Sequence, residues 1–122
     1  MRTMILAAVF AVTCSASWAY DRIPVSPAIA ERVKEGIAAI LKDPESARFG
    51  DFTAAMTPDG AIYVCGTVNA RNSFGGYAGS SPFVGVLAND NAPFKVERLG
   101  SDENEIARVI TRCQAVGALS LF

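Results

Sequence analysis

The stretch Ala61–Phe83, AIYVCGTVNARNSFGGYAGSSPF, decides how this chain folds. Its first part has the alternating pattern of a half-buried β-strand. Gly66 lies within that strand, and a glycine there predicts a bulge or the close approach of another group. The stretch then continues into a loop that is rich in glycine, asparagine and aromatic residues. The strand places its side chains in two sets, with Ile62, Val64 and Val68 on one side and Tyr63, Cys65, Thr67 and Asn69 on the other.

The residues on either side of this strand predict two β-hairpins. Thr57-Pro58-Asp59-Gly60 is a turn in which proline presets φ, aspartate bonds back to the backbone and glycine accepts a positive φ. Residues 50–57 and 61–70 should therefore form the first hairpin. Residues 82–88 and 94–99 should form the second, around the turn at residues 89–93.

Two helices are expected to flank the sheet. Ser26 is a predicted N-cap with Pro27 at the first helical position, and this helix should run to about Lys42. Asp102, with Glu105 three residues later, should start the second helix. Gly117 is its expected C-cap. The residues expected to face the core are Ile29, Val33, Ile37, Ile40 and Leu41 in the first helix and Ile106, Val109, Ile110 and Cys113 in the second.

These elements predict a single α+β domain over residues 20–122, in the order α-β-β-β-β-α. We expect a four-stranded antiparallel sheet with both helices on one face. The first helix should end near Lys42, because Asp43 precedes Pro44 and is steered away from the helical region. The following segment, Asp43-Pro44-Glu45-Ser46-Ala47, is predicted to be a cap followed by one short turn. Tyr20–Val25 is expected to be a mobile or lightly docked leader.

The N-terminus is typical of a secretory signal peptide. A basic start precedes the apolar run Met4–Val12, and small residues follow, so we place the cut after Ala19. The apolar run is too short to span a bilayer, so no membrane span is expected in the mature form. The alternative is a lipoprotein anchored through Cys14. Ala11-Val12-Thr13 fits that reading poorly, because leucine and then a small residue are expected before such a cysteine.

The net charge and the cysteine content indicate which partners, metals and cofactors this chain is expected to bind. The chain has 11 Lys and Arg against 12 Asp and Glu, and loss of Arg2 leaves 10 against 12, a net charge of −2. No basic stripe is present, which argues against nucleic acid and anionic lipid as partners. Cys65 and Cys113 would remain after export and are expected to form a disulfide. With no histidine and two thiols, a metal site is a poor alternative, and no cofactor is expected.

The loop Asn69–Ser81 is the candidate recognition element. Polar groups would supply directed hydrogen bonds, and the aromatic residues would supply flat contact surfaces. The structural alternative is that the loop uses these same residues to hold itself together and to cap the core. The candidate binding residues are Asn69, Arg71, Asn72, Phe74 and Tyr77.

No catalytic constellation is visible, so the chain is not expected to be an enzyme. The absence of histidine excludes a Ser-His or Cys-His nucleophile system. A small envelope hydrolase using Tyr77, Asp51 or Glu97 is the alternative of a different class, and the acids show no pairing. A further alternative function is that of an inhibitor of an envelope or host enzyme. The favoured expectation is a non-enzymatic periplasmic or secreted module that presents the loop to a protein or cell-wall partner.

Two motifs resemble a family of small exported proteins of Gram-negative bacteria. The first is Asp43–Phe49, which fits D-P-x-S-A-x-F. The second begins at Cys65 and ends at Phe83, and it fits C-G-x-V-N-x-[K/R]-N-x-x-G-G-Y-x-G-x-x-x-F. Thr67 stands where an acidic residue is common. The resemblance implies export and an important loop, and it implies no catalytic residue, because the family has no established activity.

Overall fold

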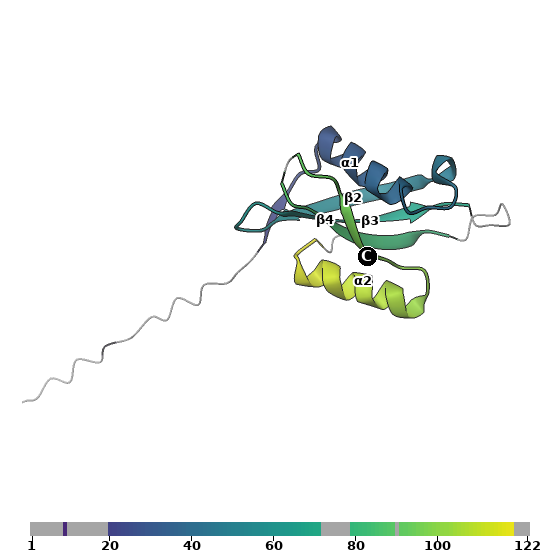
Figure 1. Ribbon diagram of the computed structural model, residues 1–122. Helices are drawn as coiled ribbons and strands as arrows, with labels where there is room; N and C mark the ends of the chain where they lie inside the picture. The colour runs from purple at the N-terminus through teal and green to yellow at the C-terminus, as the bar shows by residue number, and fades with distance from the viewer. Residues whose placement is uncertain (1–8, 10–19, 72–78, 90, 119–122) are drawn as a thin grey trace, which may run out of the picture.

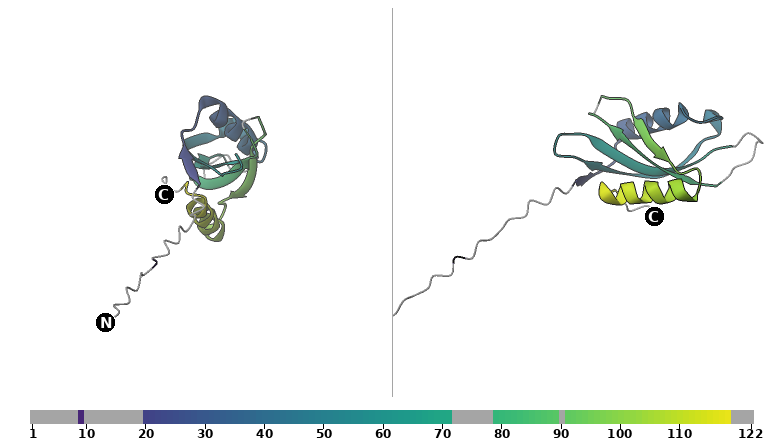
Figure 2. Two further views of the ribbon diagram at one scale, coloured as in Figure 1. Left: turned by 90° about the vertical axis from the view of Figure 1, so that its left-hand side faces the viewer. Right: turned by 60° about the horizontal axis from the view of Figure 1, so that its bottom comes forward.

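The computed structural model describes Val9 and residues 20–71, 79–89 and 91–118. In this part of the chain an antiparallel sheet lies between two helices, one on each face (Figures 1 and 2). The strands lie side by side in chain order, and every neighbouring pair is antiparallel. The elements are β1 (Asp21–Ile23), α1 (Pro27–Ala38), the 3₁₀ turn η1 (Pro44–Ser46), β2 (Arg48–Met56), β3 (Ile62–Asn69), β4 (Ser81–Leu87), β5 (Lys95–Leu99) and α2 (Glu103–Ala115).

The α+β class, both hairpins and the order of the predicted elements are confirmed. The leader is different from the prediction, because Asp21–Ile23 forms a fifth strand. It pairs with Ala54–Met56 of β2. The Arg22 Nε also donates a hydrogen bond to the Gly117 carbonyl, 3.1 Å away. The start of the domain is therefore tied both to the sheet and to the residues that follow α2.

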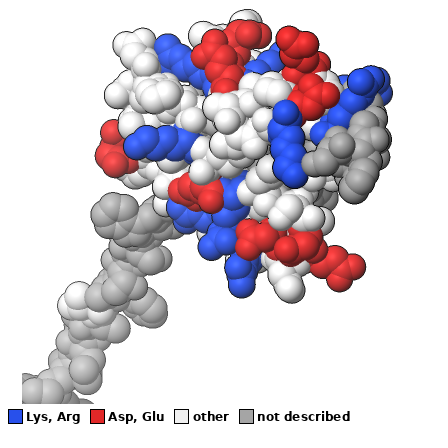
Figure 3. All heavy atoms as spheres, turned by 45° about the vertical axis from the view of Figure 1, so that its right-hand side comes forward, with Lys and Arg blue, Asp and Glu red and all other residues white. Residues whose placement is uncertain are grey.

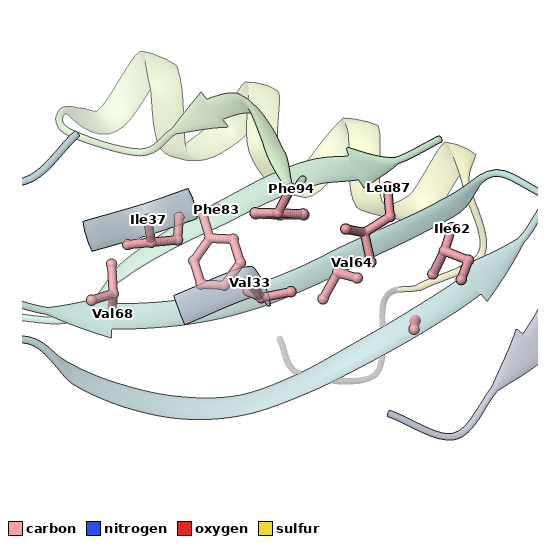
Figure 4. Packing of buried hydrophobic residues seen from close by; sticks show 9 residues of the cluster. Val33, Ile37, Ile62, Val64, Val68, Phe83, Leu87 and Phe94 are labelled. Carbon is pink, nitrogen blue, oxygen red and sulfur yellow. The ribbon is translucent and has the colours of Figure 1, made fainter. Parts of the chain in front are cut away.

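The prediction that both helices lie on one face of the sheet is wrong. Figure 1 shows α1 and α2 on opposite sides, and the buried residues form two separate clusters to match. The first cluster, under α1, contains Val33, Ile37, Ala54, Ile62, Val64, Val68, Phe83, Leu87 and Phe94 (Figure 4). The second, under α2, contains Ala55, Cys65, Val84, Val109, Cys113, Val116 and Ala118. Alternation along the strands explains the division, since consecutive strand residues point to opposite faces.

Helix α1 begins as predicted and ends earlier than predicted. Ser26 Oγ accepts a hydrogen bond from the Ile29 amide, and Pro27 is the first helical residue. The helix ends at Ala38, and the Ile40 amide then bonds to the Ile37 carbonyl, three residues back. This tighter turn moves Ile40 off the buried stripe, whereas Leu41 still packs against the first cluster as predicted. Ile40 is consequently 52% exposed, against the prediction that it faces the core.

Helix α2 has the predicted N-cap and the predicted disulfide, and its C-cap is Val116, one residue before the expected Gly117. Asp102 Oδ1 accepts from the Glu105 amide at 2.9 Å. Gly117 has φ +74°, and the next amide, that of Ala118, bonds back to the Cys113 carbonyl at 3.0 Å. Cys113 is bonded to Cys65 of β3, with the two Cα atoms 6.2 Å apart. The bond fixes α2 to a central strand of the sheet.

Four phenylalanines form a row through the first cluster. Neighbouring rings meet edge to face, with centroids 5.7 Å apart for Phe49–Phe52 and Phe52–Phe83 and 6.1 Å apart for Phe83–Phe94. Such pairs contribute about 0.5–1.5 kcal/mol each beyond the area they bury. Gly66 lies beside this row, where a side chain would collide with the rings of Phe52 and Phe83. This close approach explains why the strand has a glycine at this position. The bulge is on the partner strand, between Phe49 and Phe52.

Replacing Gly66 with alanine is expected to lower the free energy of unfolding by about 1–3 kcal/mol, the usual cost of overpacking a core. A Cβ at this position would lie 2.5 Å from Phe52 Cδ1 and 2.8 Å from Phe83 Cζ. Urea denaturation of the oxidised protein measures the effect. Adding Phe52→Leu to Gly66→Ala should restore part of the loss, because the shorter side chain frees the space. Unchanged urea midpoints for Gly66→Ala would contradict this packing.

Candidate functional site

The Asn69–Ser81 segment connects two neighbouring strands. Asn69 is the last residue of β3, Ser81 is the first of β4, and Ser81 pairs with Val68. The segment is thus the connection of a β-hairpin. Of the predicted binding residues, Asn69 and Arg71 are described, and Asn72, Phe74 and Tyr77 lie outside the described residues.

Ser46 joins the two motifs through its side chain, in addition to the pairing of Arg48 with Asn69 and of Phe49 with Val68. Its Oγ accepts a hydrogen bond from the Arg71 amide at 2.9 Å and donates one to the Asp43 carbonyl at 2.7 Å. The η1 turn holds the serine in place, because the Ser46 amide bonds to the Asp43 carbonyl at 3.2 Å. Pro44 starts this turn. One hydroxyl therefore fixes the residues that follow β3 against the turn that precedes β2, 25 positions earlier.

A hollow of about 350 Å³ lies at this contact, lined by Asp43, Glu45, Ser46 and Arg71. We call these four residues the η1 site. A guanidinium offers several donors in a planar fork, and the two carboxylates accept hydrogen bonds. The site can thus bind a partner that carries both donors and acceptors. Figure 3 shows the face of the molecule toward this end, on which Lys and Arg side chains are interspersed with Asp and Glu.

Asn69 lies next to the η1 site along the chain and pairs with Arg48 across the β2–β3 ladder. Its side-chain oxygen Oδ1 is buried, and the described residues supply no hydrogen-bond donor to it. A buried acceptor without a donor costs about 1–3 kcal/mol. Of the predicted binding residues that are described, Asn69 is therefore the one whose side chain offers an unused acceptor.

Sequence reasoning missed a larger hollow of about 590 Å³ between α1 and the start of β5. It is lined by Arg32, Glu35, Gly36, Ala39, Ile40, Pro93, Phe94, Lys95 and Val96. The exposed side chain of Ile40 forms part of its wall. The hollow extends to Ala39 and Ile40, just after α1, where the sequence predicted a longer helix. No local pattern signals a site formed by segments more than fifty residues apart.

The acids named for the hydrolase alternative are not brought together. Asp51 is on β2 and Glu97 is on β5, with β3 and β4 between them. Three strand spacings correspond to about 14 Å, too far for one acid–base pair. The Glu97 carboxylate is bound by Arg112, whose Nε lies 3.0 Å from Oε2. The same ion pair raises the pKa of the Arg112 guanidinium above its ordinary value.

The described residues hold no cluster of three or more His, Cys, Asp or Glu side chains that could bind a metal ion. None of the helices in residues 20–71, 79–89 and 91–118 has the length and apolar character needed to cross a membrane. The buried Cys65–Cys113 disulfide is consistent with an oxidising compartment outside the cytoplasm.

Comparisons with protein-family models, with curated proteins and with solved structures found no match for this chain. The resemblance to the family of exported proteins therefore stays a prediction. The hydrogen bond between Ser46 and Arg71, which connects the two motifs, is seen in the structure and does not depend on that resemblance.

Proposed function

We propose that this chain is a non-enzymatic binding module, periplasmic or secreted, that presents the end of the sheet around the η1 site to a protein partner. The observation that carries the proposal is the hydrogen bond from the Arg71 amide to Ser46 Oγ. It holds a charged residue of the β3–β4 connection beside two carboxylates on a separate turn. Binding surfaces commonly combine such loops with a rigid scaffold.

The scaffold beneath the η1 site supports this reading. Asn69 ends a strand that is paired on both sides, and Cys65 in the same strand carries the disulfide. A rigid scaffold lowers the conformational entropy lost on binding. The mixture of one guanidinium and two carboxylates complements the mixed charges of a protein surface. Electrostatic complementarity of this kind contributes specificity and association rate.

Arg71→Ala is expected to weaken binding of the partner by about tenfold or more, because charged hydrogen bonds contribute about 1.5–3 kcal/mol. The partner is first identified by crosslinking and pull-down from an envelope extract, and its affinity is then measured with purified proteins. Ser46→Ala should also weaken binding, since it releases the Arg71 backbone from the η1 turn.

The matched control is Arg108→Ala, which removes an exposed arginine from α2 on the other face of the sheet. Its affinity should equal that of the unsubstituted protein. Circular dichroism and the urea midpoint establish that each variant is folded. If Arg71→Ala and Glu45→Ala both bound the partner as tightly as Arg108→Ala does, the η1 site would not be the interface.

A further inference from the structure

A third hollow lies beside the β2–β3 turn. This turn is at the end of the sheet opposite to the η1 turn (Figure 1). Its volume of about 450 Å³ falls within the range of small-ligand sites, roughly 300–1,000 Å³. We call it the tyrosine hollow. It is lined by Tyr20, Thr57, Pro58, Asp59, Ala61 and Tyr63.

Two aromatic rings form the wall of the tyrosine hollow. The centroids of Tyr20 and Tyr63 are 6.0 Å apart, and the rings are tilted by 53°. Both rings pack against the second core cluster. Arg112 Nη2 donates a hydrogen bond to the Tyr63 hydroxyl at 3.2 Å, and its guanidinium carbon lies 5.0 Å from the ring centroid. The Tyr63 ring is thereby fixed before any ligand arrives.

The β2–β3 turn supplies the polar groups. The Thr57 amide bonds to the Ala61 carbonyl at 2.8 Å, and the Gly60 amide bonds to the Thr57 carbonyl at 3.0 Å, with Gly60 at φ +91°. The Thr57 hydroxyl also donates a hydrogen bond to Asp59 Oδ1. This bond lowers the pKa of Asp59, whose exposed carboxylate, like that of any ordinary aspartate, is ionised at neutral pH and accepts hydrogen bonds from a ligand.

From this arrangement we propose that the tyrosine hollow binds a neutral saccharide unit. A sugar ring has an apolar C–H face that packs on an aromatic ring, and hydroxyl groups that donate to a carboxylate. A cationic ligand stacked on Tyr63 would share that ring with the guanidinium of Arg112. An anionic ligand would face the carboxylate of Asp59. A neutral ligand with several hydroxyl donors avoids both repulsions.

The tyrosine hollow is separate from the η1 site. The turn at Thr57–Ala61 precedes β3, whereas Asn69 is the last residue of that strand and Arg71 follows it. Eight strand residues separate the two ends by about 26 Å. Either site can consequently be tested, and can fail, without the other.

The test is a titration of the 15N-labelled protein, followed by 1H–15N correlation spectra, with two probes: a trimer of N-acetylglucosamine and maltotriose. We expect a Kd on the order of 1 mM for at least one trimer, with shifts concentrated in residues 57–63. Asp59→Ala, an exposed substitution, should weaken that binding by about tenfold. Asp51→Ala is the matched control, because it removes an exposed aspartate that does not line the hollow and should leave Kd unchanged.

Tyr63→Ala should abolish the shifts, and Tyr63→Phe, which keeps the ring, should retain most of them. The 1H–15N spectrum of each variant without ligand shows whether it is folded, which separates loss of the stacking surface from a loss of folding. Binding of the amino-sugar trimer alone would assign the site to N-acetylated glycans, and binding of both trimers would assign it to neutral sugar rings in general. The proposal is overturned if neither trimer shifts residues 57–63 at about 10 mM. It is equally overturned if Asp59→Ala binds as the unsubstituted protein does.

Discussion

Removing the Cys65–Cys113 disulfide is expected to lower the free energy of unfolding by about 4 kcal/mol. The bond closes a loop with a sequence separation of 48, and the loss of loop entropy in the unfolded chain corresponds to about this value. It is a large share of the total stability of a domain of this size, since small domains have roughly 5–15 kcal/mol. The measurement is urea denaturation of the protein with and without reductant.

The reduced protein and the double variant Cys65→Ala/Cys113→Ala together separate two effects. Both lack the bond, but only the variant also loses the two sulfur atoms, which are fully buried in the second cluster. The variant should therefore be less stable than the reduced protein by the cost of the lost contacts. Thiol titration of the oxidised, unfolded protein should find neither Cys65 nor Cys113 free. Equal urea midpoints for the oxidised and reduced forms would contradict the expected role of the bond.

The elements of the fold that could be predicted are those that local chemistry determines. The turn at Thr57–Gly60, the N-caps Ser26 and Asp102 and the C-cap region at Gly117 each depend on a few neighbouring residues, and each lies where it was expected. Pairing of the cysteines could be predicted as well, because only two remain after the expected cut after Ala19.

The side of the sheet on which each helix lies depends on contacts that are distant in sequence. One signal was nevertheless available. Strand β4 has Phe83 and Val84 next to each other, and both are fully buried. A strand with consecutive apolar residues is buried on both faces, so the sheet needs a covering layer on each side. The neighbours Val64 and Cys65 of β3 also indicate a sheet that is covered on both faces. The valine packs in the first cluster, under α1, and the cysteine packs in the second, under α2.

Strand β1 and the η1 site could not be predicted for the same physical reason. Asp21–Ile23 has no strand pattern of its own, and its pairing with Ala54–Met56 is made across more than thirty residues. The bond between Ser46 and Arg71 likewise joins segments that only the paired strands β2 and β3 bring together. The sequence predicted the hairpin that brings the two motifs together, but no local pattern indicated the hydrogen bond between Ser46 and Arg71.

Phe83→Ala is expected to lower the free energy of unfolding by about 3–5 kcal/mol, the usual cost of truncating a buried phenylalanine. Phe83 is the largest of the fully buried side chains, and its ring meets both Phe52 and Phe94 edge to face. The substitution interrupts the phenylalanine row and leaves a cavity beside Gly66. Urea denaturation of the oxidised protein measures the loss, with the disulfide intact so that the two effects do not mix.

Phe49→Ala is the matched control for Phe83→Ala, because it removes the same side chain from the end of the row. Phe49 is half-buried and meets one ring, that of Phe52. Its loss should cost less than half as much as the loss of Phe83, since part of the vacated space opens to water. Equal losses for the two variants would mean that the row does not extend from a buried centre to a partly exposed end. The first cluster would then not be the principal core that holds α1, β3 and β4 together.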